Sequence, residues 1–149
     1  MIELFTIGFT RKRAEHFFTL LKENRVSMLV DIRLKPDSQL SGWAKREDLP
    51  WFMERLVGGS YVHLPLLAPT SDIMEIARGK QSGSRAEFER RYLALLDDRD
   101  VPNALDRALF EQHRCCLLCS EDLPEGCHRS FVADRIATAW PPVTVTHLR

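Results

Sequence analysis

Residues 114–140, RCCLLCSEDLPEGCHRSFVADRIATAW, decide the fold that we predict for this chain. The apolar run from Cys115 to Leu118 is typical of a buried strand, and a loop with Pro and Gly follows it. An apolar-periodic segment then opens with Cys-His-Arg at 127–129, which predicts the first turn of a helix. Because such a turn presents unpaired N–H groups and a partial positive charge, it favours bound anions and thiolates.

The rest of the chain continues this alternation of strands and helices. Apolar runs predict strands at 3–7, 28–32, 61–64, 114–119 and 143–148. Helical spacing and capping signals predict helices at 14–24, 47–56, 84–95, 103–113 and 130–140, with Ser84 and Asn103 as N-caps. We therefore expect one compact, Rossmann-like, three-layer α/β domain over residues 1–149, with a mainly parallel sheet.

The composition indicates one globular domain without an overall charge. The chain has 149 residues, of which 44% are hydrophobic and 28% charged. Its 21 Lys and Arg balance 21 Asp and Glu, so no global field attracts nucleic acid or a membrane. The N-terminal residues lack the apolar region of a secretion signal, and no apolar run approaches the roughly 20 residues that span a bilayer. We expect a cytoplasmic protein whose cysteines are reduced.

Polar residues follow most of the predicted strands. Ligands of open parallel sheets bind outside the carboxyl ends of the strands, so these residues should meet at one edge. They are Thr6, Gly8, Asp31, Arg33, His63, Glu121, Cys127, His128 and Arg129.

Cys127 is the best candidate for a nucleophile, because a helix N-terminus with nearby cations favours the thiolate. The alternative is a small residue half-buried against the sheet. His128 is a candidate general acid or base, or a residue that only hydrogen-bonds its neighbours. Cys119, like Cys115 and Cys116, fits a buried small hydrophobe in a strand.

Two arginines are candidates for binding an anion. The guanidinium groups of Arg33 and Arg129 could each hold a carboxylate or phosphate through two parallel hydrogen bonds, although Arg129 could instead form a surface salt bridge. Asp31 shares a strand face with Arg33, so it is either a general base, a positioning group for an arginine, or a structural ion pair. Glu121 has a similar catalytic interpretation, or it caps the next turn.

The spacing of Cys119, Cys127 and His128 does not favour a metal site. A C-x7-C-H pattern differs from fingers and ribbons, and adjacent ligands would strain a tetrahedral geometry. We expect no metal and no cofactor. Two alternatives stay open. One is a catalytic metal site that also uses Glu121, and the other is a redox disulfide between the two cysteines.

Two polar segments, 37–46 and 68–85, contain basic residues close in sequence to Trp43 and Trp51. Basic loops with aromatic residues are a weak signal for nucleic-acid binding, and solvated surface is the commoner explanation.

Four segments together resemble the domain-of-unknown-function 488 family: TIGFTRK at 6–12, LVDIRLKPDS at 29–38, YVHLPLLAP at 61–69 and LLCSEDLPEGCHRSFVADRI at 117–136. The resemblance covers nearly the whole chain and implies a compact α/β domain whose shared polar residues gather on one edge. Those residues are Thr6, Gly8, Asp31, Arg33, Pro36, Ser38, Cys119, Glu121, Cys127, His128 and Arg129.

The sequence thus favours an enzyme, a hydrolase or group transferase, acting on a small anionic molecule that carries phosphate. Arg33, Arg129, Thr6, Gly8, Ser38 and Cys119 would bind it, and Cys127, His128, Asp31 and Glu121 would carry out the chemistry. A non-catalytic module that binds a nucleotide or nucleic acid at the same edge is the alternative. A third interpretation is a partner-binding domain in which the Cys-His-Arg cluster is a structural hydrogen-bonding centre.

Overall fold

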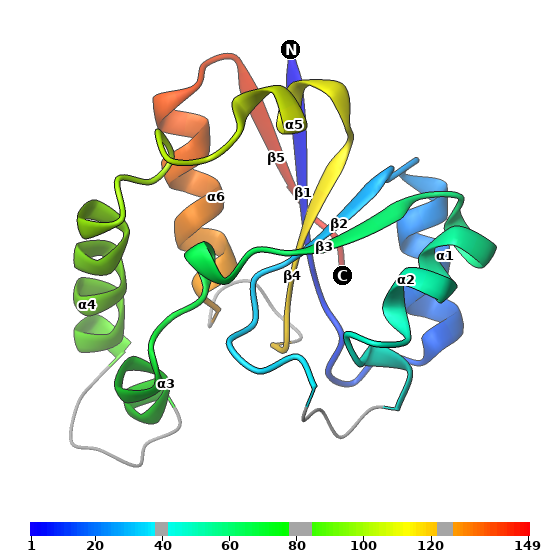
Figure 1. Cartoon of the computed structure of the whole chain (residues 1–149), viewed down its shortest axis with the longest axis horizontal. Helices are drawn as coiled ribbons and strands as arrows, with labels where there is room; N and C mark the ends of the chain where they lie inside the picture. Colours follow the sequence, from blue (N-terminus) through cyan, green and yellow to red (C-terminus); the bar gives the residue numbers. More distant parts are fainter. Residues whose placement is uncertain (38–41, 78–84, 122–126) are drawn as a thin grey trace.

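Five parallel strands form one sheet in the order β3-β2-β4-β1-β5 in the computed structural model, which describes residues 1–37, 42–77, 85–121 and 127–149 (Figure 1). The strands are β1 (Ile2–Gly8), β2 (Met28–Asp31), β3 (Ser60–His63), β4 (Cys115–Cys119) and β5 (Val143–His147). Every strand pair is parallel, so the predicted α/β class and parallel sheet are confirmed.

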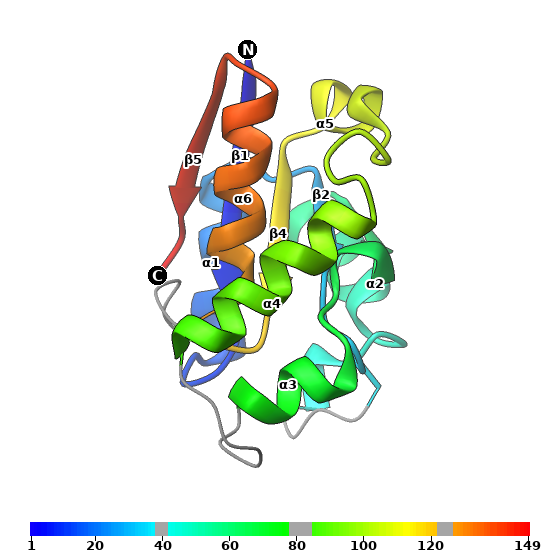
Figure 2. The same ribbon diagram turned by 90° about the vertical axis from the view of Figure 1, so that its left-hand side faces the viewer.

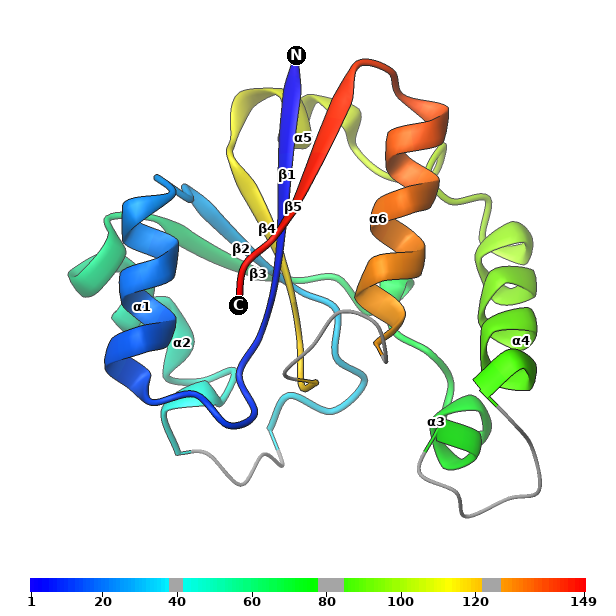
Figure 3. The ribbon, with the colours of Figure 1, turned by 180° about the vertical axis from the view of Figure 1, so that it is seen from behind.

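Helices cover both faces of this sheet, which makes three layers (Figures 1 and 3). On one face lie α1 (Ala14–Glu23) and α2 (Leu49–Phe52), the latter continued by one π-helical turn at Met53–Val57. On the other face lie α3 (Ser71–Ala77), α4 (Arg85–Asp98), α5 (Arg107–Gln112) and α6 (His128–Ala139). Short 3-10 turns occupy Gly42–Ala44 and Pro65–Leu67. Figure 2 looks onto this second face and shows α4 running at an angle to α6.

Alternate residues of each central strand enter two separate hydrophobic cores. In β4, Leu117 packs with the α4 and α6 side, while Cys116 and Leu118 pack with the α1 side. The two cores are closed by aromatic side chains such as Tyr92 in α4 and Phe17 in α1. Burial on both faces explains why the central strands read as continuous apolar runs rather than as alternating patterns.

The predicted starts of two helices were wrong. Helix α6 begins at His128 instead of residue 130, with Cys127 as its N-cap in an extended conformation. Helix α5 is capped by Asp106, whose Oδ1 accepts from the N–H of Ala108 at 3.1 Å, and not by Asn103. Asn103 instead donates to the side chain of Asp100, which keeps it outside the helix.

The two segments expected to be polar loops also differ from the prediction. Residues 71–77 form α3, because Ile73 and Ile76 lie on one face and are buried against the core. Trp43 packs against Phe9, Phe17 and Phe18 and is partly buried, whereas Trp51 is exposed. The predicted N-cap Ser84 lies outside the described residues.

After the adjacent strands β1 and β4, the chain continues on opposite faces of the sheet. Helix α1 follows β1 on one face, whereas α6 follows β4 on the other. In open α/β sheets a crevice forms at such a switch point, outside the carboxyl ends of the two strands. The fold therefore places the best position for a ligand beside Gly8 and Cys119, which are register partners.

Among the described residues, no helix combines the length and the apolar character needed to cross a bilayer.

Candidate functional site at the carboxyl edge of the sheet

Arg129, in the first turn of α6, is completely buried at the switch point. Its Nε donates to Thr6 Oγ1 at 3.2 Å, and its Nη1 lies 3.1 Å from Cys119 Sγ and 2.5 Å from the carbonyl oxygen of Glu121. The Thr6 hydroxyl in turn hydrogen-bonds Nδ1 of His147 at 2.6 Å. This guanidinium therefore joins the ends of β1 and β4 to α6, and through Thr6 it reaches β5.

Gly8 permits the close approach of the segment that follows β4. A Cβ atom at this position would lie 1.4 Å from the carbonyl oxygen of Glu121 and 2.6 Å from Nη1 of Arg129. Only glycine fits without moving the main chain. Gly8 therefore contributes to the site by its lack of a side chain.

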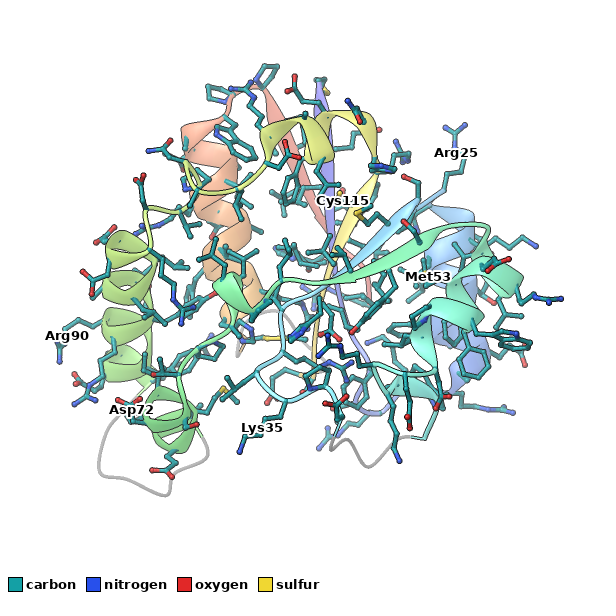
Figure 4. All side chains as sticks on the ribbon, viewed as in Figure 1. Arg25, Lys35, Met53, Asp72, Arg90 and Cys115 are labelled. Atoms are coloured by element: carbon teal, nitrogen blue, oxygen red, sulfur yellow. A yellow bond between two sulfur atoms is a disulfide. The ribbon has the colours of Figure 1, made fainter. Side chains whose placement is uncertain are left out.

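Cys119 and Cys127 form a disulfide between the end of β4 and the N-cap of α6. The expectation that all four cysteines are reduced is therefore wrong for this pair, because the switch point brings the two sulfurs together. Cys115 and Cys116 are free and buried, and Figure 4 shows Cys115 towards the opposite end of β4. In this state Cys127 is not a free nucleophile.

His128 lies beside the disulfide with a defined tautomer. Its Nε2 is 2.9 Å from the carbonyl oxygen of Ile32, which can only accept, so Nε2 carries the proton and donates. The unprotonated Nδ1 then faces Cys127 Sγ at 3.7 Å. Burial lowers the pKa of His128 to about 4, an effect strengthened by the nearby charge of Arg129. His128 is therefore neutral, with a lone pair directed at sulfur.

Asp31 and Arg33 form a buried bidentate ion pair at the end of β2. The Nε and Nη2 of Arg33 donate to the two carboxylate oxygens of Asp31 at 2.8 and 2.6 Å, and the Arg33 main-chain N–H adds a third bond at 3.1 Å. Tyr61 donates its hydroxyl to Oδ2 of the same carboxylate at 2.5 Å. Burial, followed by the Asp31 charge, raises the pKa of Tyr61 well above its usual value, so Tyr61 remains a donor.

One nitrogen of the Arg33 guanidinium takes no part in this ion pair. Nη1 of Arg33 is buried and has no hydrogen-bond partner among the described residues, although the side chain is only 3% exposed. The guanidinium also lies over the ring of Phe9, 5.3 Å from its centroid. A buried, charged donor without an acceptor is unfavourable, which makes it a marker for a bound acceptor.

The remaining predicted site residues have diverse positions. Glu121 contributes its carbonyl oxygen to Arg129, while its side chain is exposed. His63 lies beside Arg33, with Nε2 donating to the Arg33 carbonyl oxygen at 2.8 Å. Ser38 lies outside the described residues. The structure thus brings most of the predicted residues to one edge, as two adjoining groups around Arg33 and Arg129.

Sequence reasoning missed two residues of this edge, Tyr61 and His147. Both belong to strands that were predicted, and both could be found from the register of the parallel sheet. His147 is the direct partner of Thr6, and Tyr61 stands two residues before the partner of Asp31. Their side chains reach the site because they come from strands next to those that carry the predicted residues.

The same edge contains a set of atoms able to ligate a metal. Sγ of Cys119, Sγ of Cys127 and a ring nitrogen of His128 lie within 4.8 Å of one another, and all three residues are buried. Carboxylates are not part of this group among the described residues.

These features define an α/β protein with a buried sulfur, histidine and arginine site at the switch point of a parallel sheet. The chain belongs to the family described as "Domain of unknown function DUF488", whose model matches residues 13–136. No curated protein and no solved structure shows significant similarity to the chain.

Proposed function

We propose that the protein is a small cytoplasmic enzyme that hydrolyses, or transfers a group from, an anionic substrate carrying phosphate. The observation that carries this proposal is Nη1 of Arg33, a buried cationic donor without a partner among the described residues. An anionic oxygen beside it would form a charge-assisted hydrogen bond, which is about twice as strong as a neutral one.

The pairing with Asp31 supports a binding role for Arg33. Two bonds to one carboxylate fix the plane of the guanidinium, so Nη1 has one direction and loses little entropy when it binds. Asp31 is fully occupied by donors from Arg33 and Tyr61. It therefore serves to orient Arg33, and we do not assign it the role of general base.

The first turn of α6 adds positive potential to the same place. His128 bonds the carbonyl of Ile32, the residue before Arg33, so the helix N-terminus lies beside the end of β2. Unpaired N–H groups at a helix N-terminus stabilise phosphate. Two independent cationic features thus face one edge.

The reactive groups next to this anion site are the sulfurs of Cys119 and Cys127 and Nδ1 of His128. We assign the chemistry to this cluster rather than to Glu121, which enters the site through its main chain. Reduction of the disulfide is a condition for activity, because it returns Cys127 to a thiol beside the unprotonated Nδ1.

The test measures binding of inorganic phosphate and nucleoside monophosphates to the reduced protein by calorimetry, followed by a turnover screen with phosphate esters. Arg33→Met should abolish binding, and the matched control Arg90→Met, on the exposed face of α4, should leave it unchanged. Because Arg33→Met leaves Asp31 buried without its partner, the double variant Asp31→Asn, Arg33→Met provides a neutral, folded comparison.

Binding without turnover of any ester would favour the non-catalytic nucleotide module over the enzyme. Absence of binding in the folded, reduced wild-type protein would refute the role assigned to Arg33.

A further inference from the structure

Two sulfurs and one imidazole nitrogen converge in the interior of this molecule, from two segments of the chain. Cys119 ends β4, whereas Cys127 and His128 form the N-cap and first residue of α6. Their donor atoms lie within 4.8 Å of one another, and all three residues are buried. Thiolate and imidazole are the ligands that structural and catalytic zinc sites use.

The orientation of His128 matches that of a metal ligand. Ligating histidines commonly donate their second ring N–H to a main-chain carbonyl, and His128 does so through Nε2 to Ile32. Two ligands on a tetrahedral zinc ion, with bonds of about 2.3 Å to sulfur and 2.0–2.1 Å to nitrogen, are about 3.6 Å apart. Cys127 Sγ and His128 Nδ1 are 3.7 Å apart, so ligands that are adjacent in sequence meet this requirement.

Arg129 supports negative charge on the cluster. Its Nη1 lies 3.1 Å from Cys119 Sγ, where it can donate to a thiolate. Hydrogen bonds from outside the ligand set are a regular feature of metal–thiolate centres. One divalent ion would then balance the charge of the two thiolates, and the neighbouring guanidinium would supply a hydrogen-bond donor to one of them.

We propose that reduced Cys119, Cys127 and His128 bind a zinc ion through their two sulfurs and Nδ1. The disulfide is the oxidised, metal-free form of the same site. Two small thiols reduce it, giving the Cys119 and Cys127 thiols and one external disulfide. Zinc binding then releases the two thiol protons to solvent and leaves the neutral imidazole as the third ligand.

Three protein ligands leave the fourth zinc position open, which is the pattern of catalytic rather than structural sites. The proposal goes beyond the anion-binding function and does not depend on it. Zinc binding and use of Cys127 as an attacking thiolate exclude each other in one molecule. The zinc content of active protein therefore decides between the two uses of this sulfur.

The test titrates Zn2+ into anaerobically reduced full-length protein and measures metal content after gel filtration, with Co2+ absorption as a report on thiolate ligation. We expect one tightly bound ion, and none in protein oxidised to the disulfide. Cys119→Ser, Cys127→Ser and His128→Gln should each weaken zinc binding by about 100-fold or more.

Matched controls are present in the same elements. Cys116→Ser changes a buried thiol of β4 outside the cluster, and His63→Gln changes an imidazole that contacts Arg33 instead. Both should bind zinc like the wild type. The comparison of reduced with oxidised wild-type protein needs no substitution, so it stands even where a variant fails to fold.

The proposal is overturned if folded, reduced wild-type protein takes up no zinc, or if zinc uptake survives loss of either cysteine. Arg33→Met separates this result from the proposed function, because it should lose phosphate binding and keep zinc. Zinc binding without phosphate binding would leave the metal site standing and remove the anion site.

Discussion

The guanidinium of Arg129 contacts the sulfur of Cys119 at 3.1 Å inside the protein, with no exposed surface of its own. This contact connects the two groups of the site, since the same arginine also binds Thr6 and the carbonyl oxygen of Glu121. A buried charge is tolerated only when its donors are satisfied. The site is therefore also a part of what stabilises the fold.

Arg129→Met should lower the free energy of unfolding by about 3 kcal/mol or more, because each lost bond to a charged donor contributes about 1.5–3 kcal/mol. Urea denaturation of the two proteins measures it. Arg135→Met, on the same helix, removes an ion pair with the exposed carboxylate of Asp97 and should change stability by less than about 1 kcal/mol. Equal effects of the two substitutions would contradict the structural role of Arg129.

Gly8→Ala should prevent the end of β1 from approaching residue 121. The new Cβ would overlap the Glu121 carbonyl oxygen, so we expect a loss of several kcal/mol or failure to fold. Gly42→Ala is the control, because no atom lies within 4 Å of a Cβ at that position. Thermal unfolding should separate the two variants clearly, and a normal melting temperature for Gly8→Ala would count against the described approach.

Tyr61→Phe should destabilise the protein more than Tyr92→Phe. Tyr61 donates to a buried carboxylate, whereas Tyr92 donates to the neutral carbonyl oxygen of Leu67 at 2.7 Å. Bonds to charged groups contribute about 1.5–3 kcal/mol and neutral ones about 1 kcal/mol. Chemical denaturation measures both values. The reverse order would mean that Asp31 does not depend on Tyr61.

Acid should weaken the oxidised, metal-free protein through His128. The pKa of His128 is about 4 in the folded chain and about 6.5 when unfolded, so the unfolded state binds more protons between these values. Stability is then lost as pH falls from about 6.5 to about 4, by up to about 3 kcal/mol. His128→Gln should reduce this slope, while His16→Gln, an exposed control, should keep it. An unchanged slope in His128→Gln would assign the effect to another group.

The free cysteines should react slowly with iodoacetamide in the folded protein. Burial raises the pKa of the Cys115 thiol to about 12 and also raises that of Cys116, so neither forms a thiolate readily. Peptide mass spectrometry after unfolding without reductant should find these two alkylated and Cys119 and Cys127 protected by their disulfide. Alkylation of Cys127 in that unreduced sample would exclude the disulfide.

The fold class was predictable because short, mostly apolar segments mark strands that are buried on both faces, as in β2 and most of β1. The same logic located Asp31, Cys119 and Arg129, since strand ends in a parallel sheet share one edge. Helix α3 was missed because its short polar sequence contains only two buried residues, Ile73 and Ile76. A pattern that brief is not distinguishable from a loop by periodicity.

The partners of the site residues were less predictable than their positions. Nothing in the sequence states that Arg129 binds sulfur and a carbonyl instead of facing solvent, because its partners lie at separations of 8 to 123 residues. The disulfide likewise depends on how β4 and α6 pack, which spacing alone does not determine. The chemical type of each site residue can be read from the sequence, whereas its partner depends on how the strands and helices pack.

The pairing of β1 with β5 has a consequence for synthesis of the chain. Thr6, which receives the Arg129 hydrogen bond, lies beside His147, and this contact spans 141 positions. On the ribosome, β1 therefore waits until β5 has been synthesised before its neighbours in the sheet are complete. A nascent chain stalled before β5 would expose one edge of β1, and its site would lack His147, the partner of Thr6.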